Sequence, residues 1–193
     1  MLHTLRSRVE AFRKSEGDMH PFFTIGHSTR TTGEFIDLLL RSEIRQVADV
    51  RTVPRSRTNP QFNPTVLAQS LAPVGIGYSH IVELGGLRGR QKQAAEAANA
   101  LWQNDSFHNY ADYAQTPSFA EGLRQLLELG ASGPVAIMCA EAVWWRCHRR
   151  IIADYLLARG LPVFHILGPA SVVPAKLTQG AVVTGGSVTY PAP

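Results

Sequence analysis

The sequence has few of the features that would place it outside the class of ordinary globular domains. Two cysteines in 193 residues are too few for a disulfide-rich secreted scaffold. No apolar run approaches the roughly 18–20 residues of a membrane-spanning helix, and the first 18 residues lack the apolar centre of a secretory signal. These absences lead us to expect a cytoplasmic protein with reduced thiols and no membrane partner.

Lysine is also scarce: sixteen of the nineteen lysine and arginine residues are arginine. Arginine binds phosphate or carboxylate through two parallel hydrogen bonds, but a GC-rich genome would raise the arginine content without any function. The formal net charge of +4 permits an anionic small molecule or a nucleic acid as partner and requires neither. Only the positions of the arginines therefore bear on function.

Length and composition predict one domain, because 193 residues with 45% hydrophobic content can bury a full core. Leu2, Leu5, Val9 and Phe12 recur at helical spacing ahead of that domain. We therefore expect residues 1–20 to form an N-terminal helical extension and residues 21–193 to form a single domain.

Strand and helix patterns alternate from residue 22 onward. Buried strands are expected at 22–25, 46–50, 77–82, 134–139 and 162–167. Helices are expected at 32–40, 64–71 and 147–160, with helical tendency over 92–129 and a hairpin over 181–190. The alternation predicts an α/β fold: a mainly parallel Rossmann-like sheet with helices on both faces and a C-terminal β-hairpin.

Polar side chains gather where the predicted strands end. Ligands of open α/β sheets bind beyond the carboxyl ends of the strands, so these residues are the candidates for a site. They are His27 and Ser28, Asp49 and Arg51, His80, Cys139 and Glu141, and His148 and Arg149. We expect one pocket in which Arg51 pairs with Asp49 or Glu141, since a buried arginine needs a carboxylate.

The residue types suggest a division of roles within that pocket. Glu141 would be the general acid or base, Cys139 the nucleophile of a covalent reaction, and Asp49 the residue that orients an arginine or histidine. The anionic groups of the substrate would be bound by His27, Ser28, Arg51, His80, His148 and Arg149.

The stretch VAIMCAEAVWWRCHRR (135–150) leaves four interpretations open. Cys139 or Glu141 could act in an active site, or both cysteines could be core residues beside an anion-binding loop. Cys139 and Cys147 could instead form a redox disulfide. Zinc could bind to Cys139, Cys147, His148 and a distant His27, but the paired C-x-x-C spacing is missing, so no cofactor is predicted.

Several motifs follow one another in an order typical of a known family. They are TIGHST (24–29), DVR with Pro54 and Ser56, Phe62, Tyr78 and His80 with LGG (84–86), YADY and TPSF (110–119), MCAE (138–141), CHR (147–149) and HI (165–166). In these motifs the chain resembles the DUF488 family over about residues 22–190. The resemblance implies an α/β domain with a shared polar cluster and supplies no reaction. The family usually has a short polar segment between CAE and CHR, where this chain has AVWWR.

Together these features favour an enzyme, a hydrolase or transferase, that acts on an anionic, nucleotide- or nucleobase-like substrate. One alternative is a non-catalytic module that binds nucleic acid or a protein, and another is a metal-binding protein. A pocket at the strand ends would favour the enzyme, whereas a broad arginine-lined face with exposed tryptophan would favour the module.

Overall fold

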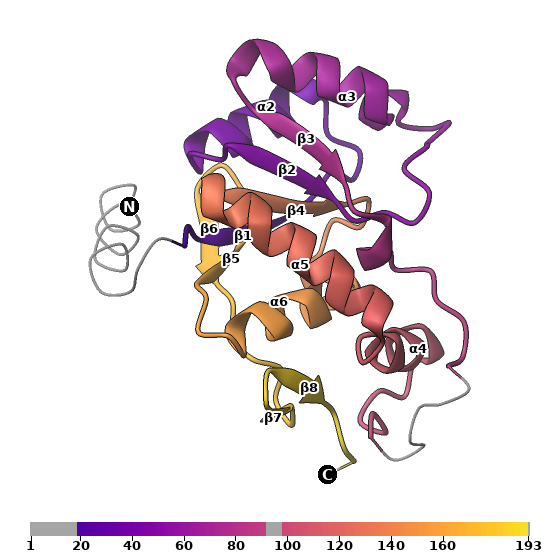
Figure 1. The fold of residues 1–193 in the computed structure, drawn as a ribbon. Coiled ribbons are helices and arrows are strands. Elements are labelled where there is room, and N and C mark those ends of the chain that lie inside the picture. The colour runs from indigo at the N-terminus through magenta and orange to yellow at the C-terminus, as the bar shows by residue number, and fades with distance from the viewer. Residues whose placement is uncertain (1–18, 92–97, 193) are drawn as a thin grey trace.

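A six-stranded sheet forms the centre of the protein (Figure 1). The structure is a computed structural model that describes residues 19–91 and 98–192. The strand order is β3-β2-β4-β1-β5-β6; β1 to β5 are parallel, and β6 is antiparallel to β5. The strands are β1 (Phe22–Gly26), β2 (Gln46–Asp49), β3 (Gly77–His80), β4 (Val135–Cys139), β5 (Val163–Gly168) and β6 (Ser171–Pro174). The predicted mainly parallel sheet is thus confirmed.

Helices cover both faces of this sheet, as predicted. Figure 1 shows α2 (Thr32–Arg41) and α3 (Pro64–Leu71) on one side, and α4 (Asp105–Tyr113), α5 (Pro117–Ser132) and α6 (Arg149–Leu157) on the other. Successive residues of a strand point to opposite faces. Ala136 and Met138 of β4 therefore pack in the core cluster under α2 and α3, and Val135 and Ile137 in the cluster under α4, α5 and α6.

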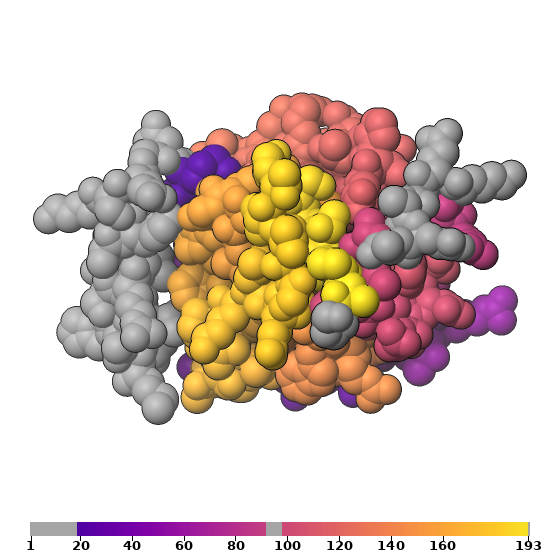
Figure 2. Space-filling view, turned by 90° about the horizontal axis from the view of Figure 1, so that it is seen from below, coloured from indigo at the N-terminus to yellow at the C-terminus, as the bar shows by residue number. Residues whose placement is uncertain are grey.

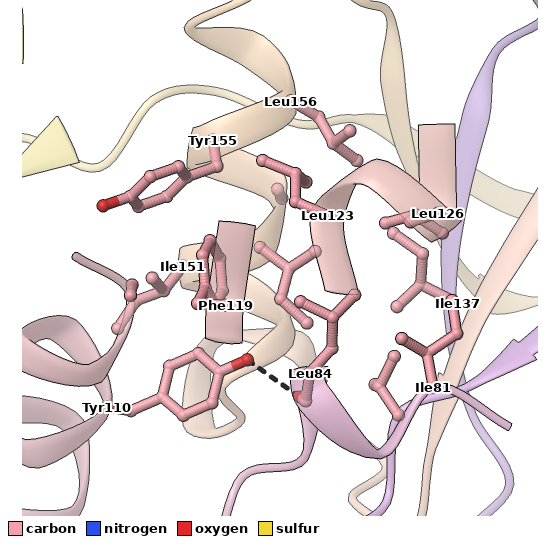
Figure 3. Packing of buried hydrophobic residues seen from close by; sticks show 14 of the residues in the cluster. Ile81, Leu84, Tyr110, Phe119, Leu123, Leu126, Ile137, Ile151, Tyr155 and Leu156 are labelled. Carbon is pink, nitrogen blue, oxygen red and sulfur yellow. Dashed lines mark hydrogen bonds between the residues drawn. The ribbon is translucent and has the colours of Figure 1, made fainter. Parts of the chain in front are cut away.

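The core under α5 and α6 fixes the position of α6 (Figure 3). Phe119 of α5 stacks edge-on against Tyr155 of α6 at 4.8 Å, and Ile151 of α6 is fully buried beside them. Each fully buried large apolar side chain stabilises the fold by about 1.5–3 kcal/mol. The Tyr110 hydroxyl, also fully buried, donates a 2.8 Å hydrogen bond to the Leu84 carbonyl. The residues that lead into α6 are consequently held rigidly against the end of β4.

Local signals in the sequence explain where the helices begin. Thr31 caps α2, and Glu34 bonds back to its backbone in a capping box. Helical tendency is expected over 92–129, and the described residues 98–129 contain α4 and most of α5, with residues 114–116 between them. Thr116 caps α5 and Pro117 occupies its first turn, which fixes that helix start. Residues 92–97 and the expected helix in residues 1–18 lie outside the described residues.

Other boundaries differ from prediction by a few residues. Helix α6 begins at Arg149 instead of 147 and ends before Gly160, which has a φ of +75° as a helix terminator often does. Strand β6 was not predicted, because a four-residue strand that ends in Pro174 has a weak pattern. The described residues also include four 3-10 turns: Pro60–Phe62, Ala72–Val74, Val82–Leu84 and Trp144–Arg146.

The predicted C-terminal hairpin is present as β7 (Val182–Thr184) and β8 (Ser187–Thr189), turned by Gly185 and Gly186 with positive φ. Figure 2 shows this yellow segment lying over the orange part of the chain. The Tyr190 hydroxyl donates a 2.9 Å hydrogen bond to the buried Asp154 carboxylate of α6. The C-terminal segment is thereby part of the domain. Among residues 19–91 and 98–192, no helix is long and apolar enough to cross a bilayer.

His165 of β5 is a buried histidine with few partners. Its Nδ1 lies 2.7 Å from the Thr24 hydroxyl, its ring stacks on Trp144 at 4.0 Å, and its Nε2 has no hydrogen-bond partner among the described residues. Burial, together with the charge of Arg149, lowers the pKa of His165 to about 4. Protonation of this ring therefore favours the unfolded chain.

We predict that His165→Leu makes the stability less dependent on pH. In the wild type, the contribution of neutral His165 is complete above the unfolded-state pKa of 6.5 and is lost as the pH falls towards 4. Between pH 7 and pH 5 the variant should lose less unfolding free energy than the wild type, by about 1–2 kcal/mol. Urea unfolding at both pH values measures the difference. An unchanged pH dependence would show that His165 is not buried in its neutral form.

Candidate active site at the carboxyl edge of the sheet

The ends of three adjacent strands bring distant residues together. Gly26 of β1 pairs with Cys139 of β4, and Asp49 of β2 pairs with Met138. The ladder continues past the strands, since the amide of Ser28 donates to the Ala140 carbonyl at 3.0 Å. The loops that follow β1, β2 and β4 therefore lie side by side, at the edge where the sequence predicted a site.

Asp49 and Arg51 form a buried ion pair at this edge. Asp49 is fully buried and accepts hydrogen bonds from Nε and Nη2 of Arg51 at 2.9 and 2.5 Å, and from the Tyr78 hydroxyl at 2.7 Å. Nη2 of Arg51 also donates to the Phe62 carbonyl at 2.7 Å, and Nη1 lies 3.3 Å from Nε2 of His27. Asp49 is thus the partner of Arg51. The guanidinium is committed to internal contacts rather than left free for a ligand.

His27 and His80 surround this pair in different ways. His27 is buried and stacks on Phe62 with the ring centres 4.2 Å apart. Burial, reinforced by the charge of Arg51, lowers the pKa of His27, so the ring is neutral at pH 7. His80 is exposed, and its Nε2 lies 2.8 Å from the Arg51 carbonyl. His27 therefore contacts the Arg51 side chain, and His80 contacts its backbone.

A cleft of about 350 Å³ opens beside the ion pair. We call it the thiolate cleft. Its lining includes both cysteines, His148 and Glu141. The Glu141 side chain is exposed, and its carboxylate makes no hydrogen bond or ion pair within the described part of the chain, whereas its backbone carbonyl accepts a 2.5 Å hydrogen bond from Nη2 of Arg149. The full lining is Arg51, Thr52, Val53, Gly86, Leu87, Ser106, Phe107, Tyr110, Cys139, Ala140, Glu141, Arg146, Cys147 and His148.

Cys147, which the predicted set of site residues omits, lies at the centre of the polar contacts in this cleft. Its sulfur lies 2.9 Å from the Cys139 sulfur, 3.3 Å from Nε of Arg149, and 3.5 Å from both the Arg149 amide nitrogen and Nδ1 of His148. Both cysteines are free thiols. A neutral thiol can donate to only one of these groups, whereas a thiolate can accept from all four once Nδ1 of His148 carries a proton. The geometry therefore suits an ionised Cys147.

His148 is oriented to exchange a proton with Cys147. Its Nε2 lies 3.0 Å from the Val50 carbonyl, which can only accept, so Nε2 carries a proton. In the neutral ring Nδ1 is then a proton acceptor, and it faces the Cys147 sulfur. Transfer of the thiol proton to Nδ1 would give a thiolate beside an imidazolium, the arrangement that activates cysteine nucleophiles.

The protein environment divides the two thiols into a neutral one and an ionised one. Burial, together with the neighbouring Cys147 charge, raises the pKa of Cys139 well above its ordinary value. Burial opposes ionisation of Cys147 as well, but the hydrogen bond from Cys139 and the charges of His148 and Arg149 outweigh it and hold the pKa well below its ordinary value. The environment therefore favours a negative charge on Cys147 over one on Cys139.

Arg149 supplies the matching positive charge. Its side chain is only 1% exposed, and its contacts are the Cys147 sulfur and the Glu141 carbonyl. No carboxylate of the described residues forms an ion pair with it. A buried guanidinium without a counter-charge would destabilise the fold by several kcal/mol, and a thiolate at Cys147 would supply that counter-charge.

Two glycines of the recognised motifs allow the backbone to approach these groups. A Cβ on Gly26 would lie 1.9 Å from the Glu141 carbonyl oxygen, and a Cβ on Gly86 would lie 2.4 Å from Nδ1 of His148. Both distances are far below van der Waals contact, so a larger residue would displace the β4 loop or the imidazole.

The side chains considered as zinc ligands, Cys139, Cys147, His148 and His27, do not form a metal site. Within residues 19–91 and 98–192, no group of three or more His, Cys, Asp or Glu side chains is arranged to hold a metal ion. A cation at Cys147 would also meet the Arg149 guanidinium, whose Nε lies 3.3 Å from the sulfur. The positive charge of Arg149 beside Cys147 favours a negatively charged sulfur rather than a bound cation.

We predict that Asp49→Ala destabilises the domain by about 3–5 kcal/mol, because it leaves the buried Arg51 charge without a partner. Urea unfolding monitored by circular dichroism measures the change. Asp37→Ala is the control, since Asp37 pairs with Arg41 on the exposed face of α2 and its loss should have a much smaller effect. Equal losses for the two variants would contradict a structural role of the buried pair.

Comparison with known proteins gives one match. The sequence profile of the family described as "Domain of unknown function DUF488" matches residues 31–156, which include every residue of the thiolate cleft. No curated protein and no solved structure matches the chain. The family description names no reaction, so any reaction has to be inferred from the residues of the site. The profile covers most of the chain and its central motifs, and the chain therefore belongs to the DUF488 family.

Proposed function

We propose that this protein is a cysteine-dependent enzyme, a hydrolase or a transferase, that acts on an anionic, nucleotide- or nucleobase-like substrate. The observation that carries the proposal is the set of four potential donors around the Cys147 sulfur at the wall of an open cleft. Thiolates, rather than thiols, are the nucleophiles of such enzymes. Cys147 is the nucleophile in this proposal, in place of the expected Cys139.

The reaction would proceed in two steps. The Cys147 thiolate attacks an electrophilic carbon of the substrate, the bond from that carbon to the leaving group breaks, and His148 gives its Nδ1 proton to the leaving group. Water, or an acceptor molecule in a transferase, then attacks the thiol-bound carbon while His148 removes its proton. The carbon–sulfur bond breaks, and the thiolate and the imidazolium are both restored.

The mouth of the cleft supports a substrate with a flat apolar part. Val53 and Leu87 are 60% and 75% exposed there, and Phe107 lies in the same lining. Large apolar side chains left exposed around a cleft mark a binding surface, and a nucleobase would cover them. Glu141 and Arg146 are exposed in the same lining and would contact polar groups of that substrate.

In this proposal four other predicted site residues do not contact the substrate. They position or stabilise the residues that do. Asp49 and Arg51 are positioning residues, because they fix the loop after β2 and its contact with His27. Arg149 stabilises the thiolate, and Cys139 donates the hydrogen bond that keeps Cys147 ionised. A thiolate of this kind stays active only in a reducing compartment, so the proposal also places the protein in the cytoplasm.

The cleft favours the enzyme over a non-catalytic module for nucleic acid or protein. A module would be expected to expose several aromatic residues on a basic face. Trp145 is 47% exposed, but the adjacent Trp144 is stacked on buried His165 and so supports the loop after β4. The polar groups converge on one sulfur instead of being spread over a surface.

We predict that iodoacetamide labels Cys147 at pH 6–7 about as fast as at pH 9, because the thiolate is already present. Peptide mass mapping over a pH series gives the labelling midpoint of each cysteine. His148→Asn and Gly86→Ala should both move the Cys147 midpoint upward, the first by removing the imidazole and the second by displacing it.

Cys139→Ser is the matched control, since a hydroxyl can still donate to Cys147 and labelling should persist. Lys176→Ala provides a variant in which no effect is expected, because Lys176 lines neither the thiolate cleft nor the contacts of Cys147. A Cys147 midpoint near the ordinary thiol pKa of about 8.5 in the wild type would overturn the proposal.

A further inference from the structure

A second hollow of about 330 Å³ adjoins the thiolate cleft. We call it the Arg55 hollow. The two share Arg51, Val53 and Ala140 in their linings, so one ligand can occupy both. The lining of the hollow is His27, Ser28, Thr29, Arg51, Val53, Arg55, Ser56, Asn59 and Ala140, without any aspartate or glutamate.

Several donors in this hollow have no internal use. Within the described residues, no hydrogen bond or ion pair involves the Arg55 guanidinium, the Ser28 hydroxyl or the Asn59 side-chain amide. Arg51, in contrast, is neutralised by Asp49 and occupied by internal contacts. Arg55 is therefore the uncompensated charge that the hollow offers to a ligand.

The backbone holds these donors in place before any ligand binds. Ser28 has a φ of +49°, an unusual conformation for a residue other than glycine, and its amide is tied to the Ala140 carbonyl. On the other side, the amides of Ser56 and Asn59 donate to the Asn63 side-chain oxygen and the Ser56 hydroxyl, at 2.8 and 2.9 Å. The loop that carries Arg55 is thus braced by its own side chains, which lowers the entropic cost of binding.

We propose that the Arg55 hollow binds a phosphate monoester of the substrate while the reactive carbon lies at Cys147. This inference rests on the proposed function and specifies its substrate class: a phosphorylated compound with a flat apolar part between its phosphate and its reactive carbon. A phosphate dianion offers three oxygens in different directions, which suits donors from two separate loops. A carboxylate carries one negative charge and its acceptor sites lie in one plane, so it matches donors from two separate loops less well.

The test measures binding of inorganic phosphate by isothermal titration calorimetry at fixed ionic strength. The protein with both cysteines intact is used, because inorganic phosphate offers the Cys147 sulfur no carbon to attack and because Cys147 contacts the buried Arg149 guanidinium. Arg55→Ala should weaken phosphate binding about tenfold or more, because it removes a charge-assisted bidentate contact. Arg57→Ala is the matched control: it removes an exposed arginine of the same loop that does not line the hollow, and binding should remain unchanged.

Ser28→Ala and Asn59→Ala should each weaken binding by a smaller factor, since they remove neutral donors. Equal weakening by Arg55→Ala and Arg57→Ala would mean that phosphate responds only to the general positive charge, and would overturn the inference. No detectable phosphate binding would overturn it as well. Neither result affects the pH series for Cys147 labelling, so failure of this subsite is distinguishable from failure of the thiolate proposal.

Discussion

The contact between the Arg149 guanidinium and the Cys147 sulfur is the interaction on which the site depends. Both groups are buried, and neither would be stable there alone, since an unpaired buried charge destabilises a fold by several kcal/mol. Their position follows from the fold. Helix α6 is fixed by Ile151 and Tyr155 in the core, so the residues at its start meet the end of β4. Gly26 then lets the Glu141 carbonyl come close enough to accept from Arg149.

The site extends across the edge of the sheet, between the two core clusters. Cys139, Cys147 and Tyr110 belong to the cluster under α4, α5 and α6, and they border the thiolate cleft. Phe62, which stacks on His27 beside the Arg55 hollow, belongs to the cluster under α2 and α3. Arg51 lines both spaces and is fixed by Asp49. The buried pair thus sets the spacing between the two halves of the site.

Much of the fold and the location of the site could be predicted from the sequence. Alternating strand and helix patterns with clear glycine and proline boundaries predicted the sheet and the hairpin, and the carboxyl-edge rule placed His27, Asp49, Cys139 and His148 at one edge. The expected single pocket is instead two adjoining spaces, and Asp49 lines neither. The pattern could not reveal whether Glu141 contributes its side chain or its carbonyl, because that depends on the path of the loop. It also could not distinguish Arg55 from Arg57, two residues apart in one loop, since only the fold shows which one lines the hollow.

The different environments of the two cysteines illustrate the same limit. Cys139 follows a buried strand and Cys147 precedes a helix, and both positions are common for reactive cysteines. Arg149 can compensate one negative charge, so the two sulfurs, 2.9 Å apart, cannot both ionise. The charge falls on Cys147, because His148 and the Arg149 side chain and amide lie against its sulfur, while the Glu141 amide lies 3.3 Å from that of Cys139. Spacing along the chain contains no information on these contacts. The roles of the two thiols are therefore set by their three-dimensional environment. Two neutral thiols would carry two protons, whereas this environment suits a pair in which a single proton lies between the two sulfurs.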